Sequence, residues 1–145
     1  MRKTYIENLR HAAHVLADSG ITLLIEAINT RDVPGYFLDT TAKAADIVES
    51  VEAENLRLQY DVYHMQIMEG DLTPTIDKYL KMIAHVQIAD TPGRHEPGTG
   101  EINYPFIFKH LDSIGYTGWI GCEFRPRTTT FESLAWFRAL KPHVG

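Results

Sequence analysis

The 145-residue chain contains a single cysteine, Cys122, so it cannot form an internal disulfide. It has no uninterrupted apolar run of about 18 residues, the length at which a membrane-spanning helix becomes a candidate. The N-terminus lacks the apolar core of a signal peptide. These three absences predict a soluble protein of a reducing compartment, and we expect it in the cytoplasm.

Basic residues are too few and too scattered to suggest a nucleic-acid surface. The chain has 14 Lys and Arg against 19 Asp and Glu, a formal net charge of −5, and no stripe gathers the positive side chains. We therefore expect neither nucleic acid nor a membrane as a partner. With 44% hydrophobic and 23% charged residues, the composition predicts one globular domain over residues 1–145.

What the chain does contain is a repeated alternation of short apolar strands with amphipathic helices. The patterns predict strands over residues 21–28, 56–63 and 83–89, and a fourth strand that ends at Glu123. Helices are predicted up to Gly20, over 41–51, from Thr73-Pro74, from about Tyr104 to Gly115, and after a possible capping box of Thr129 and Glu132. Strands that alternate with crossover helices predict a parallel sheet with right-handed connections.

Two parallel α/β architectures compete for this pattern. A doubly wound sheet often carries a glycine-rich phosphate loop after its first strand, and the segment Glu26-Ala27-Ile28-Asn29 is no such loop. A (β/α)₈ TIM barrel instead brings side chains from the carboxyl ends of several strands to one axis, and Glu26, Asp61, Gln87 and Glu123 occupy such positions. We therefore predict the TIM-barrel type. Because a whole barrel takes ~250 residues, four β/α units predict half of one.

Alternation along the fourth strand separates a packing face from an acidic face. Trp119, Gly121 and Glu123 share one face, and Cys122 lies on the other. We expect Cys122 to pack against helices and Trp119 to belong to the core. Between the third strand and the next helix runs a loop rich in glycine and proline over residues 91–100, and a loop of that length predicts a functional role.

Five segments, taken in order, carry a resemblance to a known family. They are LIEAINTR at residues 24–31, QYDVYHMQIMEG at 59–70, HVQIAD at 85–90, PGRHEPGTGEIN at 92–103 and GWIGCE at 118–123. These segments resemble the hydroxypyruvate isomerase family, which belongs to the xylose-isomerase-like sugar isomerases and epimerases. The resemblance covers essentially the whole chain and implies the C-terminal half of the family's barrel.

The resemblance implies a divalent-metal site with Glu26, Asp61, Gln87 and Glu123 as ligands, in which Glu26 and Glu123 also serve as proton donor and acceptor. Three carboxylates and an amide oxygen form an all-oxygen set, which suits Mg²⁺, or Mn²⁺, better than Zn²⁺. Related ketose epimerases have a histidine where this chain has Gln87. That difference disfavours the epimerase branch and favours Mg²⁺.

The implied reaction interconverts hydroxypyruvate and tartronate semialdehyde. A proton moves between adjacent carbons through an enediolate, whose negative charge a metal would stabilise. One carboxylate must take a proton from carbon and another must deliver one, which is the role expected of Glu26 and Glu123. His64 is expected to hold or polarise a substrate oxygen. Arg94, on the long loop, is expected to bind the substrate carboxylate as a planar fork.

Other interpretations of the same residues stay open. The chain could be a truncated half-barrel that binds metal without turnover, or an isomerase or epimerase of a related oxo-tetronate or ketose. A DNA-repair endonuclease of the same superfamily is disfavoured, because the sequence lacks histidine-rich clusters and is acidic. A half-barrel would also leave two free sheet edges, so we expect either a homodimer or a separate N-terminal half as the partner.

Overall fold

The computed structural model describes residues 1–140 of the chain. Its strands are β1 (Leu23–Glu26), β2 (Leu56–Asp61), β3 (Ile83–Ile88) and β4 (Trp119–Cys122). They form one parallel sheet in the order β1-β2-β3-β4, which is also their order along the chain. The parallel α/β arrangement predicted from the sequence is confirmed.

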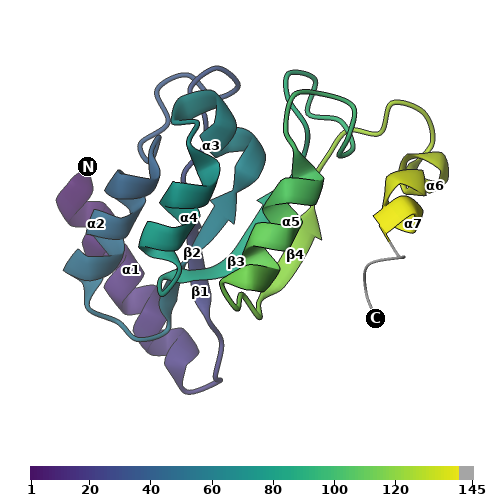
Figure 1. Cartoon of the computed structure of the whole chain (residues 1–145). Coiled ribbons are helices and arrows are strands. Elements are labelled where there is room, and N and C mark those ends of the chain that lie inside the picture. The colour runs from purple at the N-terminus through teal and green to yellow at the C-terminus, as the bar shows by residue number, and fades with distance from the viewer. Residues whose placement is uncertain (141–145) are drawn as a thin grey trace.

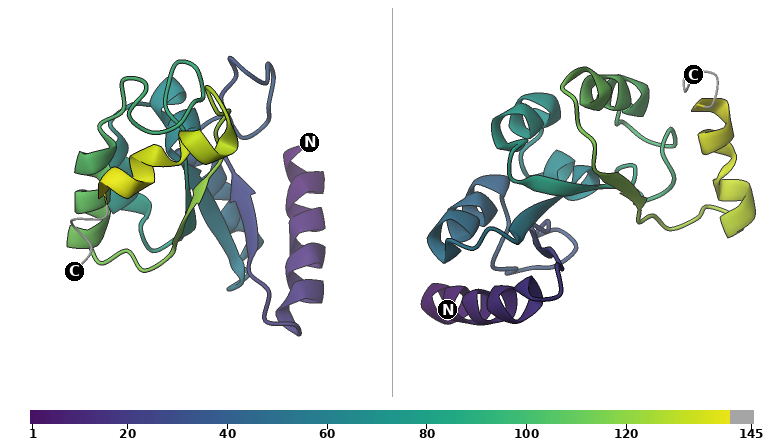
Figure 2. Two further views of the ribbon diagram at one scale, coloured as in Figure 1. Left: turned by 90° about the vertical axis from the view of Figure 1, so that its right-hand side faces the viewer. Right: turned by 90° about the horizontal axis from the view of Figure 1, so that it is seen from below.

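The helices lie in an arc around one side of this sheet (Figure 2). In chain order they are α1 (Arg2–Ala17), α2 (Thr41–Val51), α3 (Val62–Met68), α4 (Leu72–Tyr79), α5 (Tyr104–Ser113), α6 (Thr130–Ser133) and α7 (Ala135–Leu140). Helix α3 and the long loops after β1 and β3 gather at the carboxyl end of the strands, the upper end in Figure 1. Within residues 1–140, no helix is both long and apolar enough to cross a membrane.

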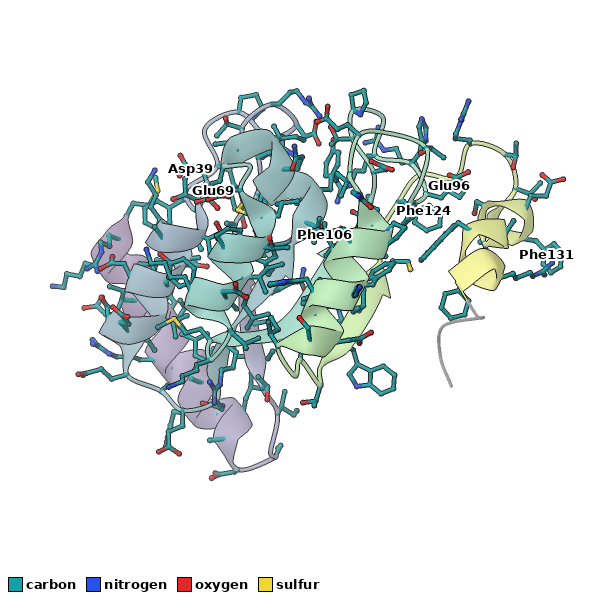
Figure 3. The ribbon with its side chains drawn as sticks, in the orientation of Figure 1. Asp39, Glu69, Glu96, Phe106, Phe124 and Phe131 are labelled. Atoms are coloured by element: carbon teal, nitrogen blue, oxygen red, sulfur yellow. The ribbon has the colours of Figure 1, made fainter. Side chains whose placement is uncertain are left out.

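Helix α2 illustrates how local sequence sets an element's ends. It spans Thr41–Val51, the range that the sequence predicts. Thr40 is its N-cap, and the Thr40 hydroxyl accepts a hydrogen bond from the backbone N–H of Lys43 at 3.3 Å. The carboxylate of Glu69, labelled in Figure 3, accepts from both the backbone N–H and the hydroxyl of Thr41. Glu69 therefore ties the end of α3 to the start of α2.

The hydrophobic core lies between the sheet and the arc of helices. Because strand side chains alternate, every second residue of β1, β2 and β3 faces the helices. Most of these outward-facing residues are 5% exposed or less, among them Ile25, Leu58, Tyr60, Val86 and Ile88. They pack in one cluster with helix residues that include Ile47, Ile76 and Ile107. The opposite face of the sheet carries polar side chains and is left for the functional site.

Strand β4 is less covered than the sequence predicts. Trp119 was predicted to be core, but it lies on the polar, open face of the sheet and is 84% exposed. Cys122 was predicted to pack against helices, and it is exposed. Trp119 is exposed because no described element lies opposite this face of the sheet. Cys122, on the outer face, is exposed because α7 packs against α5, where Trp136 stacks on Phe108 with ring centroids 6.4 Å apart. Helices α6 and α7 thus leave the outer face of β4 uncovered (Figure 1).

Several element boundaries differ from the predicted ones, and the strand predicted over 21–28 is only Leu23–Glu26. The strand predicted over 56–63 ends at Asp61, because the Asp61 carboxylate accepts the backbone N–H of His64 at 3.0 Å and starts α3. The helix predicted from Thr73-Pro74 starts at Leu72, with Asp71 as its N-cap. Pro74 fits the first turn because N–H groups there have no partner within the helix. The predicted capping box of Thr129 and Glu132 is confirmed at α6.

Candidate active site

The site begins where β1 and β2 end. Glu26 is the last residue of β1 and lies opposite Gln59, and Asp61 is the last residue of β2 and lies opposite Gln87. Parallel pairing places these side chains on one face of the sheet at its carboxyl end. The strand register therefore brings the two carboxylates together, although 34 residues of chain separate them.

Glu26, Asp61 and His64 form a compact group. One potential ligand atom from each lies within 4.8 Å of the other two. Asp61 is 1% exposed and His64 is 2% exposed. Neither Glu26 Oε1 nor Asp61 Oδ2 has a hydrogen-bond partner within residues 1–140. Buried carboxylate oxygens are normally paired, so these two oxygens indicate a place for a cation.

The pKa values of the group also indicate a place for a cation. Burial, followed by the neighbouring charges of Asp61 and Glu123, raises the pKa of Glu26 to about 8. Burial also raises the pKa of Asp61, and it lowers the pKa of His64. The site thus holds more negative charge than its own residues neutralise. A divalent cation would neutralise this charge, and the residues present fit one.

A Glu26→Gln substitution is expected to change stability in opposite directions with and without metal. Because the pKa of Glu26 is raised from its ordinary value of 4.5 to about 8 in the folded state, the folded chain binds the proton more tightly than the unfolded chain. Without metal, the free energy of unfolding of the native chain should therefore fall as pH rises from 4.5 to 8. Glu26→Gln should lack this fall and be the more stable protein at pH 8.

Added Mg²⁺ should make the native chain more stable than Glu26→Gln at pH 8, the reverse of the order expected without metal. At ~100 times its Kd, a ligand that binds only the folded state stabilises it by about 2.7 kcal/mol, and Glu26→Gln should gain much less. Urea titrations at pH 5 and 8, with and without Mg²⁺, measure both effects. Glu49→Gln, at an exposed position of α2, is the control and should behave as the native chain does. Equal Mg²⁺ stabilisation of the native chain and Glu26→Gln would show that Glu26 is not a metal ligand.

Gln59 lies beside two of the predicted ligands. It is opposite Glu26 in the sheet register, and its side-chain amide donates to Gln87 Oε1 at 2.6 Å. Gln87 is therefore held on the same face as the compact group. Gly121, opposite Gln87 on β4, keeps this face open, since a Cβ there would lie 2.7 Å from His85 Nε2.

Glu123, the fourth predicted ligand, lies just outside the compact group. It follows directly after β4, and its Oε2 accepts a hydrogen bond from Arg94 Nη2 at 2.7 Å. The Arg94 guanidinium also lies over the ring of Tyr63, 5.2 Å from its centroid. Arg94 adopts φ 56°, a left-handed conformation that is costly for a residue with a side chain. The surrounding structure holds Arg94 at the mouth of the site in this strained conformation.

A single buried carboxylate organises the loop that carries Arg94. Asp90 is 1% exposed and accepts four backbone N–H groups, at 2.9–3.1 Å. The donors are Thr91, Gly98, Gly100 and Ile102. A Cβ at Gly100 would collide with the Thr91 carbonyl oxygen, so only glycine fits there. Asp90 was not predicted from the sequence, although its position directly after a strand and before a long loop indicates such a role.

Asp90→Ala is expected to destabilise the chain strongly. The substitution leaves several N–H groups of a buried loop without an acceptor, and we expect a loss of about 3 kcal/mol or more in the free energy of unfolding. Urea unfolding measures the loss. The control is Asp77→Ala, which removes the exposed pair with His110 and should cost less than ~1 kcal/mol. Similar losses for the two variants would show that Asp90 does not organise the loop.

The same loop is tied to the segment after β4. The backbone N–H of Arg125 donates to the carbonyl of Arg94, and His95 Nδ1 lies 2.7 Å from the carbonyl of Arg125. The Glu96 carboxylate accepts the backbone N–H of Arg127 at 3.1 Å. Figure 3 labels Glu96 and Phe124 on these two segments. Arg94 and Glu123 therefore belong to one connected rim.

The ring of His64 is positioned by residues of the loop after β1, which were not predicted to have a role in the site. Asn29 is fully buried, and both its backbone N–H and its side-chain amide face His64 Nδ1, at 3.3 and 2.6 Å. Asn29 in turn contacts Asp32, whose carboxylate also accepts the hydroxyl of Tyr63 at 2.7 Å. These contacts turn His64 Nε2 towards Asp61 Oδ2, 4.0 Å away.

Parallel β/α units whose carboxyl ends assemble acidic and polar side chains define the active-site end of a TIM-barrel protein. Comparison with known proteins agrees with this class. The chain belongs to the xylose isomerase-like TIM barrel family, whose model matches residues 1–140. This confirms the predicted family and fold.

Curated relatives and solved structures both extend beyond this chain. A 2-oxo-tetronate isomerase of Cupriavidus necator is 51% identical over 99% of the chain, and the match covers 54% of that protein. The hydroxypyruvate isomerase of Escherichia coli is 51% identical over 92% of the chain, with 52% of that protein covered. The chain thus spans about half the length of these relatives, 54% and 52%, as expected for a half-barrel.

Two solved structures show the same fold. A Brucella melitensis protein described as an AP endonuclease of family 2 superposes with a TM-score of 0.92 at 51% identity, covering 95% of this chain and 54% of its own. The 3-keto-D-glucoside 4-epimerase of Escherichia coli superposes with a TM-score of 0.85 at 28% identity, covering 95% of this chain and 53% of its own.

Proposed function

We propose that this chain forms the C-terminal half of an isomerase that interconverts hydroxypyruvate and tartronate semialdehyde (2-hydroxy-3-oxopropanoate). The observation that carries the proposal is the pair of unpartnered oxygens on Glu26 and Asp61, at the carboxyl end of parallel strands. The 51% identity to a hydroxypyruvate isomerase supports the choice of reaction.

Glu26, Asp61, Gln87 and Glu123 are the residues that would hold a divalent cation. Their donor atoms are all oxygens, a set that favours Mg²⁺, with Mn²⁺ as the alternative. When bound, the cation would stabilise negative charge that develops on the substrate oxygens. Gln59 supports this set by positioning Gln87.

Glu26 and Glu123 are proposed to move the proton. The reaction removes a proton from C3 of hydroxypyruvate and adds one at C2, while the hydroxyl proton passes from O3 to O2. One carboxylate accepts the first proton and the other donates the second, so the intermediate between them is an enediolate.

Arg94 and His64 are proposed to bind the substrate. Arg94 presents a guanidinium at the mouth, where it pairs with Glu123. A planar guanidinium matches the two oxygens of the substrate carboxylate and favours oxo acids over neutral sugars. His64 faces the same space from α3 and would contact a substrate oxygen.

A second candidate substrate is a 2-oxo-tetronate. The observation that favours it is the 51% identity to the 2-oxo-tetronate isomerase of Cupriavidus necator. That substrate class shares the oxo acid end, so the roles proposed for Arg94 and the two glutamates would be the same. The difference would lie in the space available beyond C3.

We also propose that a partner completes the barrel. The sheet has two edge strands, β1 and β4, and an open inner face. Either a second copy of the chain or a separate N-terminal half would pair with these edges.

Proton exchange tests the proposed function. The chain, alone and mixed with the N-terminal part of the Cupriavidus necator relative that the match leaves uncovered, is incubated with Mg²⁺ and hydroxypyruvate in D₂O. We expect deuterium at C3 of hydroxypyruvate and the appearance of tartronate semialdehyde, both recorded by ¹H NMR. A 2-oxo-tetronate and a neutral ketose, assayed in parallel, rank the substrate classes. Mg²⁺ binding without exchange in the completed barrel would instead establish a metal-binding half-barrel without turnover.

A further inference from the structure

The contacts around His64 decide which of its ring nitrogens carries the proton. Nδ1 is approached by the backbone N–H of Asn29 at 3.3 Å and by the side-chain Nδ2 of Asn29 at 2.6 Å. A backbone N–H is always a donor. Nδ1 must therefore accept, which leaves the proton of the neutral ring on Nε2.

The orientation of the Asn29 amide is also determined by its neighbours. Asn29 Oδ1 accepts the backbone N–H of Asp32 at 2.7 Å, and Nδ2 donates to Asp32 Oδ2 at 3.1 Å. Exchanging the oxygen and nitrogen of the amide would set a donor against the N–H and an acceptor against the carboxylate. Both mismatches exclude the exchange. The side chain therefore presents an N–H to His64 Nδ1, in agreement with the backbone.

We propose that Asn29 is a positioning residue that keeps His64 in the Nε2–H form, so that His64 donates a hydrogen bond to substrate and does not ligate metal. The role in substrate binding rests on the function proposed above. A histidine that ligates metal through one nitrogen usually donates the proton of the other nitrogen to an acceptor. Around Nδ1 the structure supplies donors instead, the opposite of that arrangement.

The remaining side of the ring is suited to donation. Nε2 faces Asp61 Oδ2 at 4.0 Å, too far for a hydrogen bond, so the Nε2 proton is available to a ligand. Burial of both Asn29 and His64 excludes water as a competing partner at Nδ1. Asn29, Asp32 and Tyr63 form a continuous network behind the ring, which holds the ring plane as well as the tautomer.

The tautomer of His64 also affects which metal the site would prefer. Although His64 lies in the compact group with Glu26 and Asp61, the donor set is oxygen only. Such a set favours hard cations and leaves Zn²⁺ without its usual nitrogen ligand.

Nitrogen-15 NMR of the imidazole rings tests the assignment on the 145-residue chain without any substrate. The His64 signals are those that disappear in His64→Gln. We expect the chemical shift of a protonated nitrogen for Nε2 and that of an unprotonated nitrogen for Nδ1. Neither shift should change type when Mg²⁺ is added. A protonated Nδ1, or loss of the Nε2 proton on adding Mg²⁺, would overturn the proposal. Because no turnover is measured, the result is independent of whether the chain proves to be an isomerase.

Two variants test the part played by Asn29. The double substitution Asn29→Asp with Asp32→Asn moves one carboxylate next to Nδ1 without changing net charge, and it should switch the proton to Nδ1. Asp32→Asn alone, the matched control, should keep the native tautomer. If Nδ1 remains unprotonated in the double variant, Asn29 does not set the tautomer.

Asn29→Ala gives a second, smaller perturbation in case the double variant fails to fold. It keeps only the longer backbone donor at 3.3 Å, so a mixture of the two tautomers is expected. A fully native tautomer in Asn29→Ala would assign the effect to the backbone alone and would overturn the role of the side chain.

Discussion

Mixing this chain with the N-terminal half of a relative is expected to produce a one-to-one complex in which Trp119 becomes buried. Alone, the chain should associate with itself, because β1 and β4 both present unpaired edges. Trp119 is 84% exposed. A buried large aromatic removes about 150–250 Å² from water, which corresponds to roughly 4–6 kcal/mol at ~25 cal/mol per Å². This side chain therefore favours closure strongly.

Sedimentation equilibrium and tryptophan emission measure the assembly. In a Trp136→Phe background, Trp119 is the remaining tryptophan of the two in the chain. Its emission should shift to the blue when the N-terminal half is added, as the complex replaces the self-associated form. Trp119→Lys should weaken the complex, whereas Phe131→Lys, at an exposed position of α6, should not. A cooperative monomer at micromolar concentration, with emission unaffected by the added half, would refute the expected assembly.

Glu123→Gln is expected to lower the turnover of the completed barrel by roughly 10² or more, the range found when a general acid or base is lost. Glutamine keeps the size and one carbonyl oxygen of the side chain but cannot accept a proton. Metal binding should weaken less than turnover, because Glu26 and Asp61 remain in place. His64→Ala should cause a smaller loss, since it removes a substrate contact and leaves both proton-transfer groups.

Turnover with hydroxypyruvate and Mg²⁺ titration of the same samples separate the two effects. Glu101→Gln is the matched control, because Glu101 is an exposed glutamate at the end of the loop that carries Arg94. Losing the Arg94–Glu123 ion pair should itself cost little, since it lies at a partly exposed site. Native turnover in Glu123→Gln would remove Glu123 from proton transfer.

The sequence predicted the parts of the fold that depend on local pattern. Helix 41–51 has an N-cap and an apolar stripe, and both ends were predicted correctly. Helix α3 was missed because it follows β2 with no turn residue between them. Only the carboxylate of Asp61, which accepts the N–H of His64, marks the change from strand to helix. A residue chosen as a metal ligand thus also acts as a cap, and no periodicity shows this.

The sequence predicted which strand ends contribute side chains to the site. It did not predict the contacts that hold those side chains in place. Alternation placed Glu26 and Asp61 on one face, and the structure brings them together. The partners of His64 were not predictable, because Asn29 reaches it across 35 residues of sequence. The exposure of Trp119 was not predictable for a related reason. It depends on what faces the open side of the sheet, and not on the sequence of the strand itself.

The order of the strands in the sheet has a consequence for how the chain folds. Each strand pairs with the strand that follows it in the sequence, so most contacts between strands join neighbouring β/α units. Because every strand pairing joins adjacent β/α units, the sheet can be built unit by unit from the N-terminal side during synthesis. Each newly added strand then becomes the free edge, and β4 is the last of them. We therefore expect the partner proposed above to pair with β4 only after the other three strands are in place, because β4 is the last edge to form.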